Sequence, residues 1–117
     1  MYKVDKPTNS LHSLQEVSFS SLGFRERDHL QEWLAKNPQA LTRDNDDELL
    51  IIQKEFAGFD DTKERLDLLA LDKKGNLVII ENKLDDSGRD VVWQALKYAG
   101  YCANLRQESV VEILQLY

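Results

Sequence analysis

Two apolar runs separated by a short polar stretch constrain the fold of this chain more than any other feature. Residues 65–72, RLDLLALD, and residues 76–84, NLVIIENKL, lie on either side of a KKG sequence. Apolar runs of this length around a glycine-containing turn predict two antiparallel strands joined as a hairpin. Both strands also carry charge: Asp67 in the first, and Glu81 and Lys83 in the second. A core strand has no structural need for such residues, so all three are candidates for function.

The register of this hairpin decides whether the three charges meet, because side chains alternate between the two faces of a strand. A three-residue loop at Lys74-Gly75-Asn76 places Asp67 opposite Lys83 and turns all three charges to one face. A two-residue loop at Lys74-Gly75 would turn Asp67 to the other face. We predict the three-residue loop, with Gly75 or Asn76 supplying a positive φ.

The rest of the chain supplies a third strand and two helices. Residues 25–36 are predicted to be a helix that ends before Pro38, and residues 49–56, LLIIQKEF, to be a strand. Residues 90–105 are predicted to be a second long helix, capped by Ser87 or Asp90. The order helix, three strands, helix predicts an α/β domain with a mixed sheet flanked by helices.

Length and charge limit the classes of function. A chain of 117 residues fits one domain, and we expect residues 1–20 to be an N-terminal arm and residues 21–117 the domain. A capping-box pattern at Ser109 predicts the start of a helix, which would have only about two turns before Tyr117. We therefore expect the chain to continue past Tyr117 into a downstream domain. A net charge of −6 argues against a large passive DNA-coating surface but not against a metal-dependent site.

The compartment follows from what the sequence lacks. Cys102 is the single cysteine, which excludes a disulfide within this sequence and suits a reducing compartment. No stretch reaches the ~18 apolar residues of a membrane helix. We therefore expect a cytoplasmic protein with no membrane partner.

Asp67 and Glu81 together predict a cation site. Two carboxylates in a cleft of low dielectric raise each other's pKa, and a divalent cation removes that penalty. Carboxylate and carbonyl oxygens, with water, are ligands that Mg²⁺ accepts. Lys83 can orient or deprotonate an attacking water, or neutralise developing negative charge. These are the parts needed for metal-assisted hydrolysis of a phosphodiester.

The same residues carry a resemblance to a known family. Asp67 followed by Glu81-Asn82-Lys83 resembles the D…(D/E)xK signature of the PD-(D/E)xK nuclease superfamily. Gln94 and Tyr98 resemble the QxxxY motif of its RecB-type members, and Glu26 resembles the acidic residue of the first helix. The run from about Phe24 to Leu105 is most similar to the NucS-like endonuclease branch.

The resemblance implies a restriction-endonuclease-like core, truncated at its C-terminal part, that acts as a Mg²⁺-dependent nuclease on DNA. It implies Mg²⁺ or Mn²⁺ held by Asp67 and Glu81, with Glu26 holding the metal or its waters. Gln94 and Tyr98 would position the lysine or a DNA phosphate. The implied catalytic residues are Asp67, Glu81, Lys83, Gln94 and Tyr98.

Basic residues supply further candidates for phosphate contact: Lys97, Arg89, Lys73 and Lys74, with Lys63 and Arg65. Glu55, in the strand at residues 49–56, can face the same cleft. An unpaired sheet edge favours a homodimer.

Each assignment has an ordinary alternative. The three strand charges can form a buried ion network without chemistry, Glu26 can cap its helix, and Gln94 and Tyr98 can be packing residues. The alternative function is a catalytically inactive module of the same fold that binds nucleic acid or protein.

Overall fold

The chain is built around a three-stranded sheet, seen in a computed structural model that describes residues 1–43, 47–58, 64–84 and 91–117. The sheet has the order β3-β4-β5, and a separate two-stranded sheet pairs β1 with β2. The strands are β1 (Tyr2–Asp5), β2 (Ser10–Ser13), β3 (Leu49–Phe56), β4 (Leu66–Asp72) and β5 (Leu77–Ile80). The helical elements are η1 (Ser20–Leu22), η2 (Glu26–Leu30), α1 (Gln31–Lys36), η3 (Pro38–Leu41), α2 (Val91–Cys102) and α3 (Gln107–Leu116).

The predicted order of elements is confirmed. The strand at 49–56 matches β3, and the first predicted helix spans η2, a single π-helical turn, and α1. The β5 strand is shorter than expected, because beyond Ile80 the backbone N–H of Asn82 donates to the Asp67 carboxylate instead of continuing the ladder. The predicted helix caps Ser87 and Asp90 lie outside the described residues.

The β4–β5 hairpin has a three-residue loop, as predicted, but the loop begins one residue earlier. It consists of Lys73-Lys74-Gly75, with Gly75 at φ +85°, because Asp72 accepts hydrogen bonds from the N–H groups that follow it. Leu68 pairs with Ile80 and Leu71 with Leu77, a register two residues away from the predicted one. A shift of two residues preserves facing. Asp67 and Glu81 therefore share a face, and Asp67 lies opposite Glu81 rather than Lys83.

The prediction of a mixed sheet is wrong for the part of the chain that the structure describes. Both β3–β4 and β4–β5 are antiparallel. The three strands follow one another along the chain, with a three-residue loop joining β4 to β5, and a parallel partner would need a longer crossover connection.

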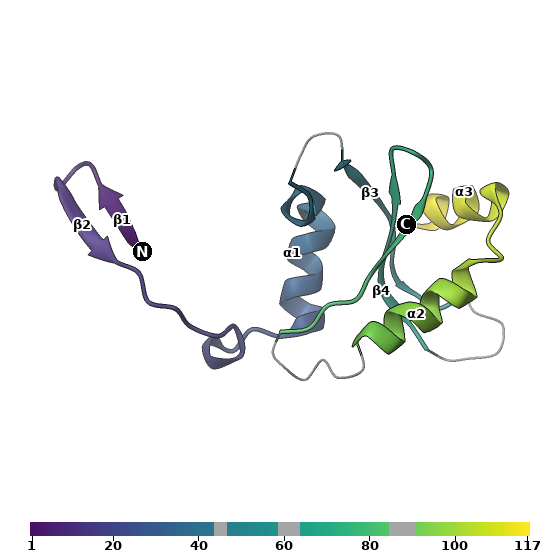
Figure 1. The fold of residues 1–117 in the computed structure, drawn as a ribbon, viewed down its shortest axis with the longest axis horizontal. Helices are drawn as coiled ribbons and strands as arrows, with labels where there is room; N and C mark the ends of the chain where they lie inside the picture. The colour runs from purple at the N-terminus through teal and green to yellow at the C-terminus, as the bar shows by residue number, and fades with distance from the viewer. Residues whose placement is uncertain (44–46, 59–63, 85–90) are drawn as a thin grey trace.

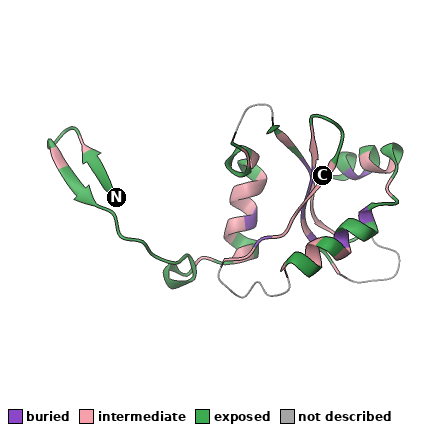
Figure 2. Cartoon of the chain, in the orientation of Figure 1, coloured by how far each residue is buried: buried purple, intermediate pink, exposed green. Residues whose placement is uncertain are grey.

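Helical layers cover both faces of this sheet (Figure 1). On one face, Leu68 and Ala70 pack against Leu34 and Ala35 of α1. On the other face, Leu69 packs in a cluster with Tyr98 and Cys102 of α2 and Ile113 of α3. The β4 strand is the most deeply buried of the three, as the purple segments of Figure 2 indicate. Residues at the ends of β4 thus lie on the most deeply buried strand of this sheet.

The N-terminal arm projects away from this body (Figure 1). Its β1–β2 hairpin exposes Tyr2, Val4 and Leu11, each about two thirds accessible at 65–66%. Phe19 and Phe24 join the arm to Trp33 through edge-to-face ring contacts. None of the helices in the described segments has the length and hydropathy needed to cross a bilayer.

Candidate metal centre

Asp67 and Glu81 face each other where the β4–β5 ladder ends. Asp67 immediately precedes Leu68 and Glu81 immediately follows Ile80, and those two residues form the terminal pair of the ladder. The Asp67 backbone N–H donates to Glu81 Oε1 over 3.4 Å, and the Asn82 backbone N–H donates to Asp67 Oδ2 over 2.9 Å. Within the described residues, Asp67 Oδ1 and Glu81 Oε2 accept no hydrogen bond. Each carboxylate is thus fixed through one oxygen and has the other available.

The electrostatics of this pair are unfavourable in the absence of a cation. Burial, followed by the charge of the neighbouring Asp67, raises the pKa of Glu81 to about 7. Burial is also the main cause that raises the pKa of Asp67, with contributions from the charges of Glu55 and Glu26. Lys83 acts in the opposite direction on both carboxyls. A divalent cation between the two would supply the missing positive charge.

Lys83 and Glu26 meet at the edge of this site. Lys83 Nζ lies 3.9 Å from Glu26 Oε2, and Glu26 Oε1 accepts a hydrogen bond from the Leu84 backbone N–H over 3.1 Å. Glu26 belongs to the π-helical turn η2, so the first helix contacts the segment after β5 through this residue. Glu26 is expected to be a metal ligand, yet its two oxygens face Lys83 and Leu84. The described residues contain no cluster of at least three histidine, cysteine, aspartate or glutamate side chains suited to a metal.

Gln94 and Tyr98 of α2 lie on the same side of the sheet as the carboxylate pair. The Tyr98 hydroxyl donates to the Arg65 carbonyl oxygen over 2.9 Å, two residues before Asp67. Burial, followed by the Glu81 charge, raises the pKa of Tyr98 to about 12, so the phenol keeps its proton. Gln94 Oε1 is buried without a hydrogen-bond partner in the described structure. Tyr98 fixes the start of β4, and Gln94 retains an acceptor for a further ligand.

The predicted phosphate-contacting residues are not gathered at one place. Lys97 pairs with Glu64 at 2.5 Å, beside the Tyr98 ring. Lys73 lies 3.4 Å from Glu48 at the hairpin tip, where Lys74 is exposed. The tip is the opposite end of β4–β5 from Asp67, which separates Lys73 and Lys74 from the carboxylate pair. Arg89 and Lys63 lie outside the described residues.

One cluster was not predicted: Arg27 and Gln31 of the first helix and Arg65 before β4 all converge on Glu55 of β3. Glu55 Oε1 lies 2.8 Å from Arg27 Nε and accepts a hydrogen bond from Gln31 Nε2 over 3.2 Å. Glu55 Oε2 lies 3.6 Å from Arg65 Nη1. Glu55 is also held at φ +53°, a left-handed conformation that costs a residue other than glycine about 1 kcal/mol. The i,i+4 spacing of Arg27 and Gln31 is a sequence signal that they share a helix face.

The carboxylate pair fits a hard divalent cation. Its donors are carboxylate oxygens, and Mg²⁺ or Mn²⁺ commonly takes one or two protein carboxylates and fills its shell with water. The available oxygens Asp67 Oδ1 and Glu81 Oε2 are the ones that would hold such an ion. Because Glu26 pairs with Lys83, the remaining positions of the shell would fall to backbone carbonyls and water.

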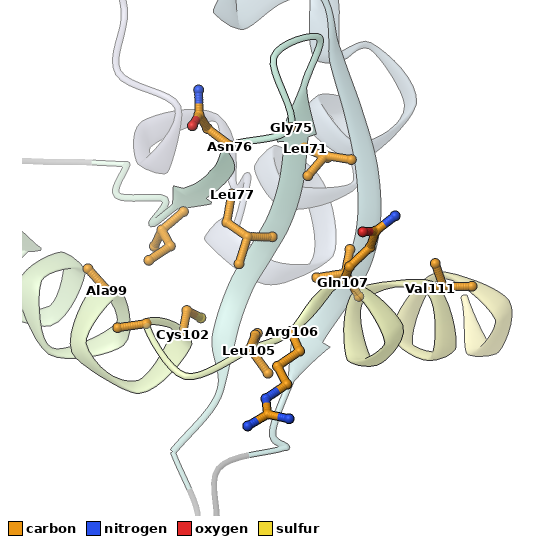
Figure 3. A pocket seen from close by; sticks show the side chains of 13 residues that line it. Leu71, Gly75, Asn76, Leu77, Ala99, Cys102, Leu105, Arg106, Gln107 and Val111 are labelled. Carbon is orange, nitrogen blue, oxygen red and sulfur yellow. The ribbon is translucent and has the colours of Figure 1, made fainter.

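The described residues also form a hollow away from the carboxylate pair. It has a volume of about 820 Å³ and opens between the β4–β5 hairpin and the α2–α3 corner. Leu71 and Leu77 line it from the sheet, and Cys102 of α2, Val111 of α3 and Leu105 between these helices line it from the other side (Figure 3). Asp67 and Glu81 do not line it, so the charged site is an open edge of the sheet rather than this apolar hollow.

No family model matches the chain, and neither does any curated protein or solved structure. The function is therefore argued from the geometry of these residues and from the motif that they resemble.

Proposed function

We propose that this chain carries the metal-binding and catalytic part of a divalent-cation-dependent nuclease that hydrolyses phosphodiester bonds in DNA. The observation that carries the proposal is the half-buried Asp67–Glu81 pair, in which both pKa values are raised, beside Lys83. Acidic pairs of this kind are costly without a cation and are typical of functional sites.

A purely structural ion network explains the pair less well. In such a network each carboxylate would have a basic partner. Asp67 and Glu81 instead each accept one backbone N–H, and the ion pair of Lys83 is with Glu26. Without a cation, the pair therefore destabilises the folded chain, and no ion pair of its own offsets this cost.

The residues divide the chemistry among them. Asp67 and Glu81 hold Mg²⁺ or Mn²⁺, which when bound polarises a phosphate oxygen and lowers the pKa of a coordinated water. Lys83, oriented by the Glu26 carboxylate, donates to the phosphate oxygen on which negative charge develops. Tyr98 holds the start of β4 through the Arg65 carbonyl oxygen, and the Gln94 amide orients substrate or water.

One observation favours the second candidate, a nuclease-fold module that binds without hydrolysis. Lys83 Nζ lies 3.9 Å from the carboxylate of Glu26, a residue that we expected at the metal. This carboxylate neutralises part of the charge on the lysine. This candidate predicts a folded protein that shows no cleavage with either metal.

Cleavage of plasmid and single-stranded DNA with Mg²⁺ or Mn²⁺ tests the proposal. We expect Asp67→Asn, Glu81→Gln and Lys83→Ala each to lower the rate by at least about 100-fold, because each removes a group that acts on the reacting phosphate. Asp72→Asn, at the far end of the same hairpin, is the matched control and should cleave at the unaltered rate. A purified protein that cleaves neither substrate with either metal refutes the proposal.

A further inference from the structure

The cluster around Glu55 has features that a structural salt bridge alone does not require. Two guanidinium groups from distant parts of the chain converge on one carboxylate, which leaves a local charge of +1 in a protein of net charge −6. The Glu55 side chain is 22% exposed, whereas those of Arg27 and Arg65 are 68% and 60% exposed. Glu55 thus lies inside and presents both arginines outward.

The arginines keep most of their donors. Arg27 meets Glu55 through Nε, and Arg65 meets it through Nη1. Among the described residues, both Nη groups of Arg27 and Nη2 of Arg65 donate no hydrogen bond. The planar guanidinium fork is suited to bidentate binding of phosphate oxygens. Gln31, 2% exposed, fixes Glu55 from beneath, so the arrangement is organised before any ligand arrives.

This cluster adjoins the candidate metal centre. Arg65 precedes Asp67 by two residues, and Tyr98 holds its carbonyl oxygen. Arg27 follows Glu26, whose carboxylate meets Lys83. The Glu55 charge also lies close enough to Asp67 to help raise its pKa. A phosphate bound between the two arginines would therefore lie beside the site where Asp67 and Glu81 act.

We propose that Arg27 and Arg65, held by Glu55, bind a backbone phosphate adjacent to the scissile one. This rests on the proposed function and deepens it, because it makes the substrate a polynucleotide with at least two consecutive phosphates rather than a mononucleotide. The left-handed Glu55 is the positioning residue of this phosphate site.

Fluorescence anisotropy of a labelled DNA oligonucleotide, in EDTA so that neither metal nor cleavage contributes, tests the proposal. The double variant Arg27→Gln/Arg65→Gln should bind about tenfold more weakly than the unaltered protein, with a salt dependence shallower by about 0.7–0.9 in the log–log slope for a lost phosphate contact. The matched control Arg43→Gln/Arg106→Gln removes the same two charges from exposed sites outside the cluster and should leave affinity unchanged. Circular dichroism checks that each variant is folded.

Single variants keep the test decisive if the double variant does not fold. Arg27→Gln and Arg65→Gln should each weaken binding about threefold, as roughly equal shares of a tenfold loss. Equal binding by the cluster variants and the unaltered protein overturns the proposal. So does an equal loss in the control, and so does absence of DNA binding by the unaltered protein.

The two proposals fail separately. Glu81→Gln, which should abolish cleavage, should still bind DNA in EDTA. An arginine-dependent affinity without any cleavage would refute the nuclease and leave the phosphate site standing. Cleavage at a rate that does not depend on Arg27 or Arg65 would refute the phosphate site and leave the nuclease proposal standing.

Discussion

The two ends of the β4–β5 hairpin place carboxylates in opposite surroundings. At the tip, Asp72 Oδ1 accepts hydrogen bonds from the Lys74 and Asn76 backbone N–H groups, and Oδ2 accepts one from Asn76 Nδ2. These bonds hold the pKa of Asp72 below its ordinary value. At the open end, burial raises the pKa of both Asp67 and Glu81.

The difference separates a structural carboxylate from the pair that we propose as the metal site. Asp72 accepts hydrogen bonds from three N–H donors, so its charged form is stabilised where it is. Asp67 and Glu81 are half-buried with one backbone donor each, so their charged forms need a further positive group. Residue type and strand position are alike at the two ends, and burial and donors decide the role.

The largest expected effect on stability lies at the tip. Gly75→Ala should lower the free energy of unfolding by about 1–2 kcal/mol, because alanine must adopt the left-handed conformation that Gly75 has at φ +85°. A steric clash does not contribute, since an added Cβ would meet no atom within 4 Å. Urea denaturation measures the change. Mn²⁺ affinity should not alter, and a loss of affinity would mean that the two ends are not independent.

A smaller and pH-dependent effect lies at the open end. The pKa of Glu81 is about 7 in the folded chain and 4.5 ordinarily, so between these values the folded protein holds a proton that the unfolded chain has lost. Without metal, the midpoint of thermal unfolding should therefore fall as pH rises from about 4.5 to about 7 and lose this slope above it. Glu81→Gln should remove this contribution and melt a few degrees higher than the unaltered protein at pH 8. Identical pH profiles for the two proteins would contradict the assignment.

The hairpin and its facing were predictable from sequence, and its register was not. Apolar periodicity and the KKG turn located both strands, and the odd loop length set the facing of Asp67 and Glu81. The loop began one residue early because the Asp72 side chain accepts hydrogen bonds from the N–H groups of the turn. The sequence alone does not indicate which polar residue of the turn will make such a contact.

The cluster of Arg27, Gln31 and Arg65 around Glu55 could not be predicted from the sequence. Glu55 and Arg65 could be considered individually as residues near a cleft, but their convergence with Arg27 depends on how the first helix lies across β3 and β4. The left-handed conformation of Glu55 belongs to a strand that is also bulged between Ile51 and Gln53, and no glycine marks either irregularity.

Glu26 marks a similar limit. The family resemblance placed it at the metal, but its partners Lys83 and Leu84 come from the segment after β5. The π-helical turn that carries Glu26 also departs from the regular α-helical spacing, which the sequence pattern does not indicate.

Binding of Mn²⁺, measured by isothermal titration calorimetry at pH 7.5, tests the central claim most directly. The account predicts saturable binding of a single ion per chain. The affinity should fall by about 10–100-fold or more in Asp67→Asn and in Glu81→Gln. Asp72→Asn, which changes the carboxylate at the other end of the hairpin, should bind as the unaltered protein does. A folded protein that binds no Mn²⁺, or whose affinity is the same in Asp67→Asn, would contradict the account.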